Sequence, residues 1–315
     1  MPFLSFWHDR LSSNLKAALL TLFGVSAFVV NDSLTRVAGN TLPVSQVMLL
    51  RGLFASLTLF IWLRTKGPLP PIRAMLDLRL LARNILDGTA TILFLMALAK
   101  MPLANVFAIL QGIPLAVTAA AAILLREPVG WRRWGAIGIG FLGVLICLRP
   151  GPDGFSIYAI CLLLSVICSA LREIVTRTIR PELPSSVVSF VTSIAVGLFG
   201  LLILPFETRS WQTPGWAELL ALFFAGVFVI LGLISTTAAI RGGDVSFAAP
   251  FRYGNLIVAI LIGWLFFAEL PDALTLIGSA IIVGSGLFTL YRERVRKDAQ
   301  PIAAENMARG APRGI

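Results

Sequence analysis

The sequence predicts an all-α membrane protein with ten transmembrane helices, and three observations lead to that fold class. Of the 315 residues, 57% are hydrophobic and only 13% are charged. The hydrophobic residues gather in apolar runs close to the roughly 20 residues that a helix needs to cross a bilayer. The runs of the second half repeat the pattern of the first half, so we expect two units of five helices.

The expected spans follow one another with short connections, which leave no room for a separate soluble domain. They cover residues 15–37, 43–64, 79–99, 102–125, 133–149, 155–177, 185–205, 216–240, 245–268 and 272–291. The first unit is therefore 15–149 and the second 155–291. A short N-terminal tail, 1–14, precedes them, and we expect the tail 292–315 to be disordered.

Basic residues are distributed unevenly between the two sides of the predicted bundle. With the N-terminus in the cytoplasm, 18 of the 26 Lys and Arg residues fall in cytoplasmic loops and tails. Four fall outside, at Arg36, Lys100, Arg149 and Arg209, and four lie within spans. Because cytoplasmic loops carry an excess of Lys and Arg, we expect a multi-pass protein of the bacterial inner membrane with both termini in the cytoplasm. The same rule accounts for the net charge of +10 without a nucleic-acid partner.

The two halves match best near their ends. Anchoring Glu127 on Glu269 pairs Gly112 with Gly254, and further glycines match after a gap of one residue. Since five spans is an odd number, the second copy must enter the membrane from the other side. Inverted repeats around a site near the midplane of the bilayer are typical of secondary transporters.

The order of these elements resembles the drug/metabolite transporter superfamily, and within it the EamA-type family of ten-helix proteins. The resemblance rests on PFRYGN, GWLFFAELPD and GSGLFTLYRE in the second half and on a glutamate–proline pattern after spans four and nine. It implies two inverted five-helix bundles around a central cavity lined mainly by helices 1, 3, 4, 6, 8 and 9. The first copy departs from the pattern at Glu127-Pro128, where an intervening residue is missing.

Polar and aromatic residues cluster at similar depths in spans one, four and nine. Gln111 and Tyr253 are suited to hydrogen-bond a solute, and Phe107 or Phe251 to stack on a ring. Hydrogen bonding between helices and core packing are the alternative roles. An arginine in hydrocarbon is costly, so we expect Arg252 to face the cavity. The candidate substrate-binding residues are Arg252, Tyr253, Gln111, Asn31, Asn105, Phe107, Phe251, Asn255 and Arg51.

Two aspartates lie well inside spans, and they are the candidates for proton coupling. Arg83 and Asp87 are four residues apart on one helix, so they share a face and are expected to form a structural ion pair. Asp32 has no such neighbour in the sequence and is the better candidate for carrying a proton. The alternative for all intramembrane charges is that they neutralise one another and lock helices together.

The sequence favours a secondary transporter that moves a small organic metabolite across the inner membrane by alternating access. The resemblance extends to a branch that includes riboflavin and S-adenosylmethionine carriers. Riboflavin uptake is the leading candidate, ahead of S-adenosylmethionine or amino-acid-type transport or export. A membrane-embedded enzyme is a remote alternative, because no histidine cluster, paired interfacial carboxylates or Cys–His set is present. We expect no metal and no cofactor; the partners are the lipid bilayer and a small-molecule substrate, and a homodimer stays open.

Overall fold

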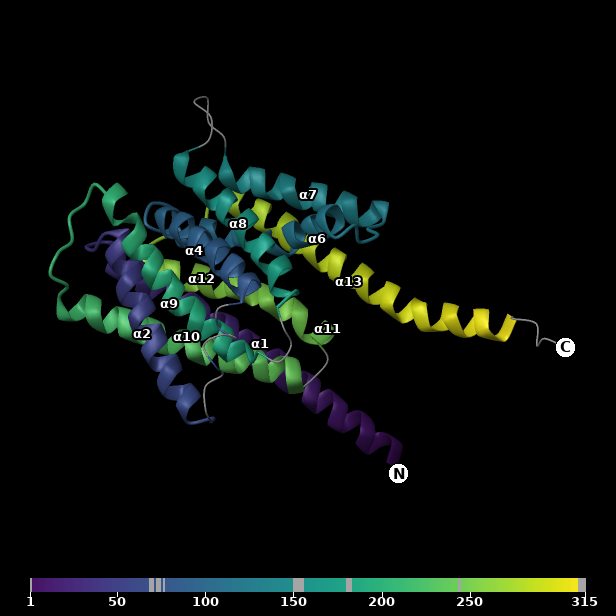
Figure 1. The fold of residues 1–315 in the computed structure, drawn as a ribbon. Coiled ribbons are helices and arrows are strands. Elements are labelled where there is room, and N and C mark those ends of the chain that lie inside the picture. Colours follow the sequence, from purple (N-terminus) through teal and green to yellow (C-terminus); the bar gives the residue numbers. More distant parts are fainter. Residues whose placement is uncertain are drawn as a thin grey trace.

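The computed structural model describes residues 2–67, 71, 75, 77–149, 156–179, 183–242 and 245–310. Within these ranges all regular structure is helical, and ten helical stretches are long and apolar enough to cross a membrane. The prediction of an all-α protein with ten transmembrane helices is therefore confirmed (Figure 1).

The helices keep the order of the predicted spans. The first five crossings are α1 (Pro2–Gly39), α2 (Val44–Arg64), α4 (Leu78–Leu98), α5 (Leu103–Leu110) with α6 (Ile113–Leu124), and α7 (Trp131–Leu148). The second five are α8 (Ile157–Thr176), α9 (Ser185–Ile203), α10 (Trp216–Gly242), α11 (Val245–Ala248) with η2 (Ala249–Tyr253) and α12 (Gly254–Phe267), and α13 (Ala273–Gly310). A short 3-10 turn, η1 (Leu204–Phe206), follows α9.

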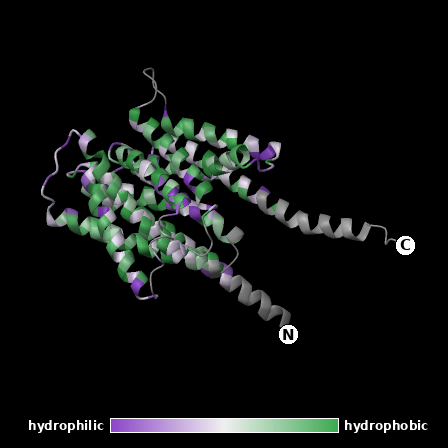
Figure 2. Cartoon of the chain, viewed as in Figure 1, coloured by the Kyte–Doolittle hydropathy of each residue, from purple (hydrophilic) through white to green (hydrophobic). Residues whose placement is uncertain are grey.

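The two ends of the chain leave the bundle on the same side, as an even number of crossings requires (Figure 1). We call the side where α1 begins and α13 ends the terminal face, and the other side the opposite face. The outside of the bundle is largely hydrophobic, while hydrophilic residues collect at its ends and near its middle (Figure 2). Large apolar side chains such as Phe266, which is 77% exposed, suit contact with lipid chains.

The segment after Tyr291 differs from the expectation of a disordered tail. The structure continues α13 as a helix as far as Gly310. Residues 292–310 contain four alanines and four arginines, which have high helix propensity and favour extension of a helix already formed in the membrane, and Pro301 is the exception to this composition.

Helices from the two halves pack against one another in pairs. The closest pairs are α1 with α10, α4 with α8, α2 with α9, and α7 with α13. At the α7–α13 crossing, a side chain added at Gly143 would meet the carbonyl oxygen of Gly278 at 2.9 Å. The glycines at this crossing therefore let the two backbones approach closely, which is the packing role of small residues in membranes.

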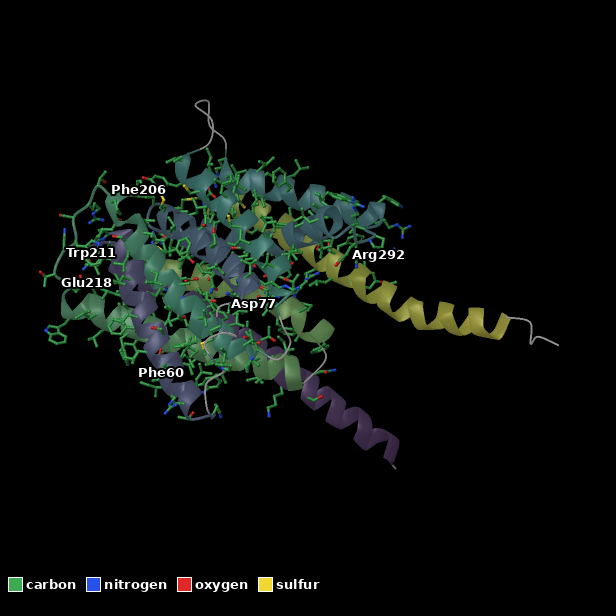
Figure 3. The ribbon with its side chains drawn as sticks, viewed as in Figure 1. Phe60, Asp77, Phe206, Trp211, Glu218 and Arg292 are labelled. Carbon is green, nitrogen blue, oxygen red and sulfur yellow. The ribbon has the colours of Figure 1, made fainter. Side chains whose placement is uncertain are left out.

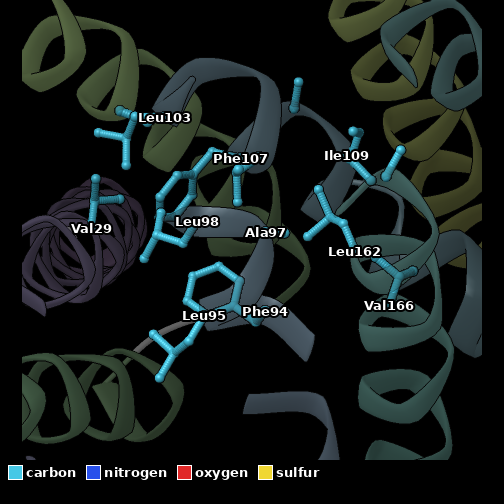
Figure 4. Close-up of a cluster of buried hydrophobic side chains, with 14 of the residues drawn as sticks. Val29, Phe94, Leu95, Ala97, Leu98, Leu103, Phe107, Ile109, Leu162 and Val166 are labelled. Atoms are coloured by element: carbon cyan, nitrogen blue, oxygen red, sulfur yellow. The ribbon is translucent and has the colours of Figure 1, made fainter. Parts of the chain in front are cut away.

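The apolar core centres on α5. Val106, Phe107 and Ile109 are at most 3% exposed and pack with side chains from several other helices. In the close-up, Phe107 lies near Leu98 of α4 and Val29 of α1 (Figure 4). This half of the fourth crossing is thus the best-buried part of the bundle.

The loop between α9 and α10 is hydrogen-bonded to the start of α2 on the opposite face. The Glu207 carboxylate accepts hydrogen bonds from the backbone N–H groups of Val44 (2.6 Å) and Ser45 (3.1 Å). Trp211 donates its indole N–H to the Ser45 hydroxyl at 2.7 Å. Figure 3 shows Trp211 and Glu218 together at this end of the molecule, far from Arg292. A carboxylate at a helix N-terminus satisfies free N–H groups and favours the helix dipole.

Candidate functional site

Two membrane crossings are interrupted at about half their depth. α5 has 8 residues before the break at Gln111 and Gly112, while α11 and η2 have 4 and 5 residues before α12 begins at Gly254. At a rise of about 1.5 Å per residue, each break lies roughly 12–14 Å from the start of its crossing. That is near the middle of a hydrocarbon core about 30 Å thick, where transporters place their sites.

Gln111 joins the two breaks. Its amide group donates to the backbone carbonyl of Tyr253 at 3.1 Å and to the side-chain oxygen of Asn255 at 2.6 Å. The side chain is 5% exposed, so these bonds are made away from water. The structure thus brings together three of the residues selected from the sequence, and the contact is polar but uncharged.

The two broken crossings also end in the same way. Arg126 and Ala268 both adopt left-handed backbone angles, with φ of 54° and 53°. The next residue is the glutamate in each case: the N–H of Glu127 donates to Ala121 and that of Glu269 to Gly263, six residues back. The register that pairs Glu127 with Glu269 therefore also pairs residues of equal backbone geometry.

Two buried polar atoms within the membrane spans have no hydrogen-bond partner in the described part of the chain. They are the side-chain carbonyl oxygen of Asn31 and the hydroxyl of Tyr253. The Tyr253 hydroxyl lies against Gly286 of α13. Buried polar groups are nearly always satisfied, so each of these two atoms is a candidate for contact with a bound solute, and the Tyr253 hydroxyl belongs to the residue that precedes the break at Gly254.

Asp32 does not stand alone in the membrane. One of its oxygens lies 3.5 Å from a guanidinium nitrogen of Arg51, and the same oxygen accepts a hydrogen bond of 2.9 Å from the Asn31 amide. Both charged side chains are less than one-fifth exposed. The aspartate selected for proton coupling and the arginine selected for substrate binding are thus partners on α1 and α2.

Asp87 has a different partner from the one that the sequence predicted. It pairs with Arg172 of α8 at 2.5 Å rather than with Arg83, which donates to the Thr192 hydroxyl and to Asn84. Arg83 also donates to the Thr176 hydroxyl of α8, so its guanidinium is directed towards hydroxyl acceptors on α8 and α9. The tightly packed neighbour α8 supplies the closer cation.

The remaining candidates lie apart from Gln111. Asn105 accepts a hydrogen bond from Thr275 at 3.1 Å, near the start of α13. Phe107 is enclosed in the apolar core, so it packs against protein side chains in this conformation. Phe251 and Arg252 are exposed on η2, where the Phe251 ring lies 6.0 Å from the Phe247 ring.

One prominent cluster was not selected from the sequence. Arg36, at the end of α1, makes two hydrogen bonds of 2.8 and 2.6 Å to the two oxygens of Glu269. The carboxylate also accepts the backbone N–H of Leu103, the first residue of α5, at 2.9 Å. The signal available in the sequence was the recurrence of a glutamate at the equivalent position of both halves, Glu127 and Glu269.

The pKa of Glu269 reflects these contacts. Burial raises the pKa of the carboxyl group, but the hydrogen bonds from Arg36 and Leu103 and the charge of Arg36 outweigh this effect. The pKa is therefore held below its ordinary value, and the carboxylate stays ionised at neutral pH.

Comparisons with known proteins agree with this architecture. The model of the EamA-like transporter family matches the chain twice, over residues 15–149 and 156–291. An S-adenosylmethionine uptake transporter of Rickettsia felis is 28% identical over 278 residues, covering 88% of this chain and 92% of the relative. A riboflavin transporter of Vibrio cholerae is 30% identical over 279 residues, covering 87% and 92%. A pseudopaline exporter of Pseudomonas aeruginosa is 27% identical over 282 residues, covering 87% and 95%. One solved crystal structure matches with a TM-score of 0.60 and 18% identity, covering 88% of this chain and 98% of the other.

Proposed function

Because this chain belongs to the EamA-like transporter family, it is a multi-pass membrane transporter, and we propose that it works as a secondary carrier by alternating access. The two halves, 15–149 and 155–291, would act as inverted copies around the helix breaks at Gln111 and Tyr253. Transport would need no ATP hydrolysis by this chain and would involve no covalent chemistry.

The pairing of helices supports inverted copies. Exchanging the two halves turns the pair α1–α10 into the pair α8–α4, and both pairs pack closely. The pairs α2–α9 and α7–α13 are each exchanged into themselves, as expected for elements on a two-fold axis. An axis in the membrane plane follows from the odd number of crossings in each half.

We place the terminal face in the cytoplasm. The basic residues concentrate on the loops and tails of that face, with Arg64, Arg79, Arg132 and Arg177 among them. The positive-inside rule then puts both termini in the cytoplasm of a bacterial cell and the Arg36–Glu269 pair on the external side.

Riboflavin uptake is the substrate proposal that the site favours. The observation that carries it is a charge balance: both aspartates deep in the spans are matched by arginines, Asp32 by Arg51 and Asp87 by Arg172. The contact at the helix breaks, made by Gln111, is uncharged. A neutral solute rich in carbonyl and hydroxyl groups suits such a site better than a cation, which would need an unmatched carboxylate.

Aromatic residues on α11 and η2 add to this proposal. Phe247 and Phe251 form a tilted pair with rings 33° apart, and both are about one-third exposed. We assign them to the entrance on the terminal face, where they would receive a flat ring system. The exposed guanidinium of Arg252 beside them would donate to ring carbonyls.

S-adenosylmethionine is the second candidate, because a relative bearing that name matches 88% of the chain. Uptake of radiolabelled riboflavin and S-adenosylmethionine into proteoliposomes with purified protein would separate the two. We expect saturable riboflavin uptake that unlabelled flavin competes away. Expression should also rescue a riboflavin auxotroph at low external riboflavin. Failure of both assays with correctly inserted protein would reject the flavin proposal, and failure with every organic solute would reject transport itself.

A further inference from the structure

The Arg36–Glu269 pair on the opposite face has a counterpart on the terminal face. Residues 31–36 of α1 read NDSLTR, and residues 172–177 at the end of α8 read REIVTR. Each segment has an acidic residue second, a threonine fifth and an arginine sixth. Thr35 and Thr176 each donate their hydroxyl to the carbonyl four residues earlier. The match pairs Arg36 with Arg177, just as the earlier register pairs Glu269 with Glu127.

Arg177 and Glu127 also contact each other, so both faces carry an arginine–glutamate pair built from equivalent residues. The closest approach of Arg177 to Glu127 is 3.5 Å, a single contact. Arg36 and Glu269 instead make two short hydrogen bonds in the fork geometry that is the strongest form of this interaction. One pair is therefore closed and the other is loose.

Burial follows the same difference. The side chains of Arg36 and Glu269 are 11% and 24% exposed, whereas those of Arg177 and Glu127 are 52% and 50% exposed. Thr35 is 1% exposed, and its counterpart Thr176 is exposed. Exposed ion pairs contribute little to stability, so the terminal-face pair does not hold that end together in this conformation.

Helix packing shows the same asymmetry. On the opposite face α5 packs closely against α12. The equivalent pair on the terminal face would be α11 and η2 against α6, and in the part of the chain that the structure describes these do not pack closely. Glu269 further accepts the N–H of Leu103 at the start of α5, so one carboxylate ties together α1, α5 and the end of α12.

We infer that the two arginine–glutamate pairs close the transport path alternately, with Arg36–Glu269 sealing the opposite face in the conformation seen here and Arg177–Glu127 sealing the terminal face in the other. In that second conformation both carboxylate oxygens of Glu127 accept hydrogen bonds from Arg177. Glu127 also accepts a hydrogen bond from the backbone N–H of Val245, the residue equivalent to Leu103 in the register of the repeat. Arg36 then releases Glu269, and α5 separates from α12. This inference rests on the proposed alternating access and names the residues that set its equilibrium.

Cysteine accessibility tests the inference without measuring transport. Thr35→Cys and Thr176→Cys are made singly in a background with Cys147, Cys161 and Cys168 replaced by alanine, and a maleimide is added to the detergent-purified protein. Before further change, Cys at 35 should react slowly and Cys at 176 quickly. Glu269→Gln removes the charge but keeps the shape, so it should open the opposite face and close the terminal face.

The expected result is a rise of about tenfold or more in the alkylation rate at position 35, the size set by losing charge-assisted hydrogen bonds, with a fall at position 176. Glu127→Gln should leave position 35 slow and position 176 fast. Glu218→Gln is the matched control, because this carboxylate accepts a hydrogen bond from Thr41 on the same face and has no ion pair with any residue that the structure describes.

Local loosening around Glu269 would speed alkylation at position 35 without slowing it at position 176, and that outcome would overturn the inference. So would unchanged rates in folded Glu269→Gln protein. If that variant does not accumulate, Arg36→Lys keeps the charge but loses the two-pronged geometry and should shift both rates in the same directions. Because no solute is added, a wrong substrate assignment leaves these results unaffected.

Discussion

The two broken crossings share one construction but lie in different surroundings. Both are interrupted at mid-depth and both end on a left-handed residue followed by a glutamate. The first half of the fourth crossing, α5, is nevertheless enclosed in the core, while its counterpart in the ninth crossing, η2, exposes Phe251 and Arg252. Equivalent positions of the two halves thus differ in burial, and under the proposed alternating access this difference would exchange between the halves in the other conformation.

The contact between the two breaks should have the largest effect on transport. Gln111→Leu removes the donor that serves the Tyr253 carbonyl and Asn255, and each buried group left unsatisfied costs about 1–3 kcal/mol. We expect transport to fall at least about tenfold at equal amounts of protein in the membrane. Thr118→Val is the control, because among the described residues this hydroxyl bonds only within its own helix turn, to the Pro114 carbonyl. Wild-type uptake by Gln111→Leu would separate the helix breaks from function.

Asp32 is next in expected effect. If it carries the coupled proton, Asp32→Asn should abolish solute accumulation driven by a pH gradient while solute exchange at equal pH continues. The Arg51 guanidinium, 3.5 Å away, would then be released to the solute in the protonated state and held in the ionised state. Asp87→Asn is the comparison, because the Asp87–Arg172 contact between α4 and α8 is shorter, at 2.5 Å, and its loss should lower stability instead. Gradient-driven accumulation by Asp32→Asn would exclude the proton role.

Tyr253→Phe should have a moderate and selective effect. The hydroxyl has no partner in the described part of the chain, so its removal should leave the thermal unfolding temperature unchanged or slightly raised. If the group binds the solute, KM should rise by about two- to tenfold, the value of one hydrogen bond. Uptake kinetics and thermal unfolding are measured side by side, with Tyr158→Phe on α8 as the control. A fall in stability with unchanged KM would assign the hydroxyl to packing.

The number of spans could be predicted from the sequence, because each span is a local run of apolar residues that is long enough to cross the bilayer and contains few charges. The partners in the ion pairs could not be predicted in this way. Asp87 has two arginines within possible reach, Arg83 one turn away and Arg172 at 85 positions in the chain, and the packing of α4 against α8 determines which one it contacts. The Glu269 cluster was missed for the same reason: Arg36 is 233 positions from it. The contact of Gln111 with Tyr253 could have been predicted from the sequence. The register that pairs Glu127 with Glu269 also pairs these two residues, so both are expected at the same depth.

The opposite-face pair also predicts a specific response to pH. The pKa of Glu269 is lowered, so its stabilising contribution is present above the ordinary glutamate value of 4.5 and is lost only as the pH falls through the lower native value. The difference in unfolding temperature between the parent and Glu269→Gln should thus stay constant from neutral pH to near 4.5 and narrow below it. Thermal unfolding across this range measures it. A difference that disappears well above pH 4.5 would contradict the closed pair.

The smallest effect concerns the left-handed residues that precede the two glutamates. A residue other than glycine pays about 1–2 kcal/mol in this conformation, while glycine loses roughly 0.5–1 kcal/mol more backbone entropy on folding. Ala268→Gly and Arg126→Gly should therefore each stabilise the fold by up to about 1 kcal/mol, whereas Ala120→Gly inside α6 should destabilise it by a similar amount. Unfolding midpoints in denaturant give the values.

The two substitutions should differ in the size of their stabilisation, because Ala268 precedes the closed pair of Glu269, while Arg126 precedes the loose pair of Glu127. Greater freedom at position 268 should also loosen the grip of Glu269 on Arg36, so its gain should be the smaller of the two, and equal gains would show that the pairs do not depend on this backbone geometry.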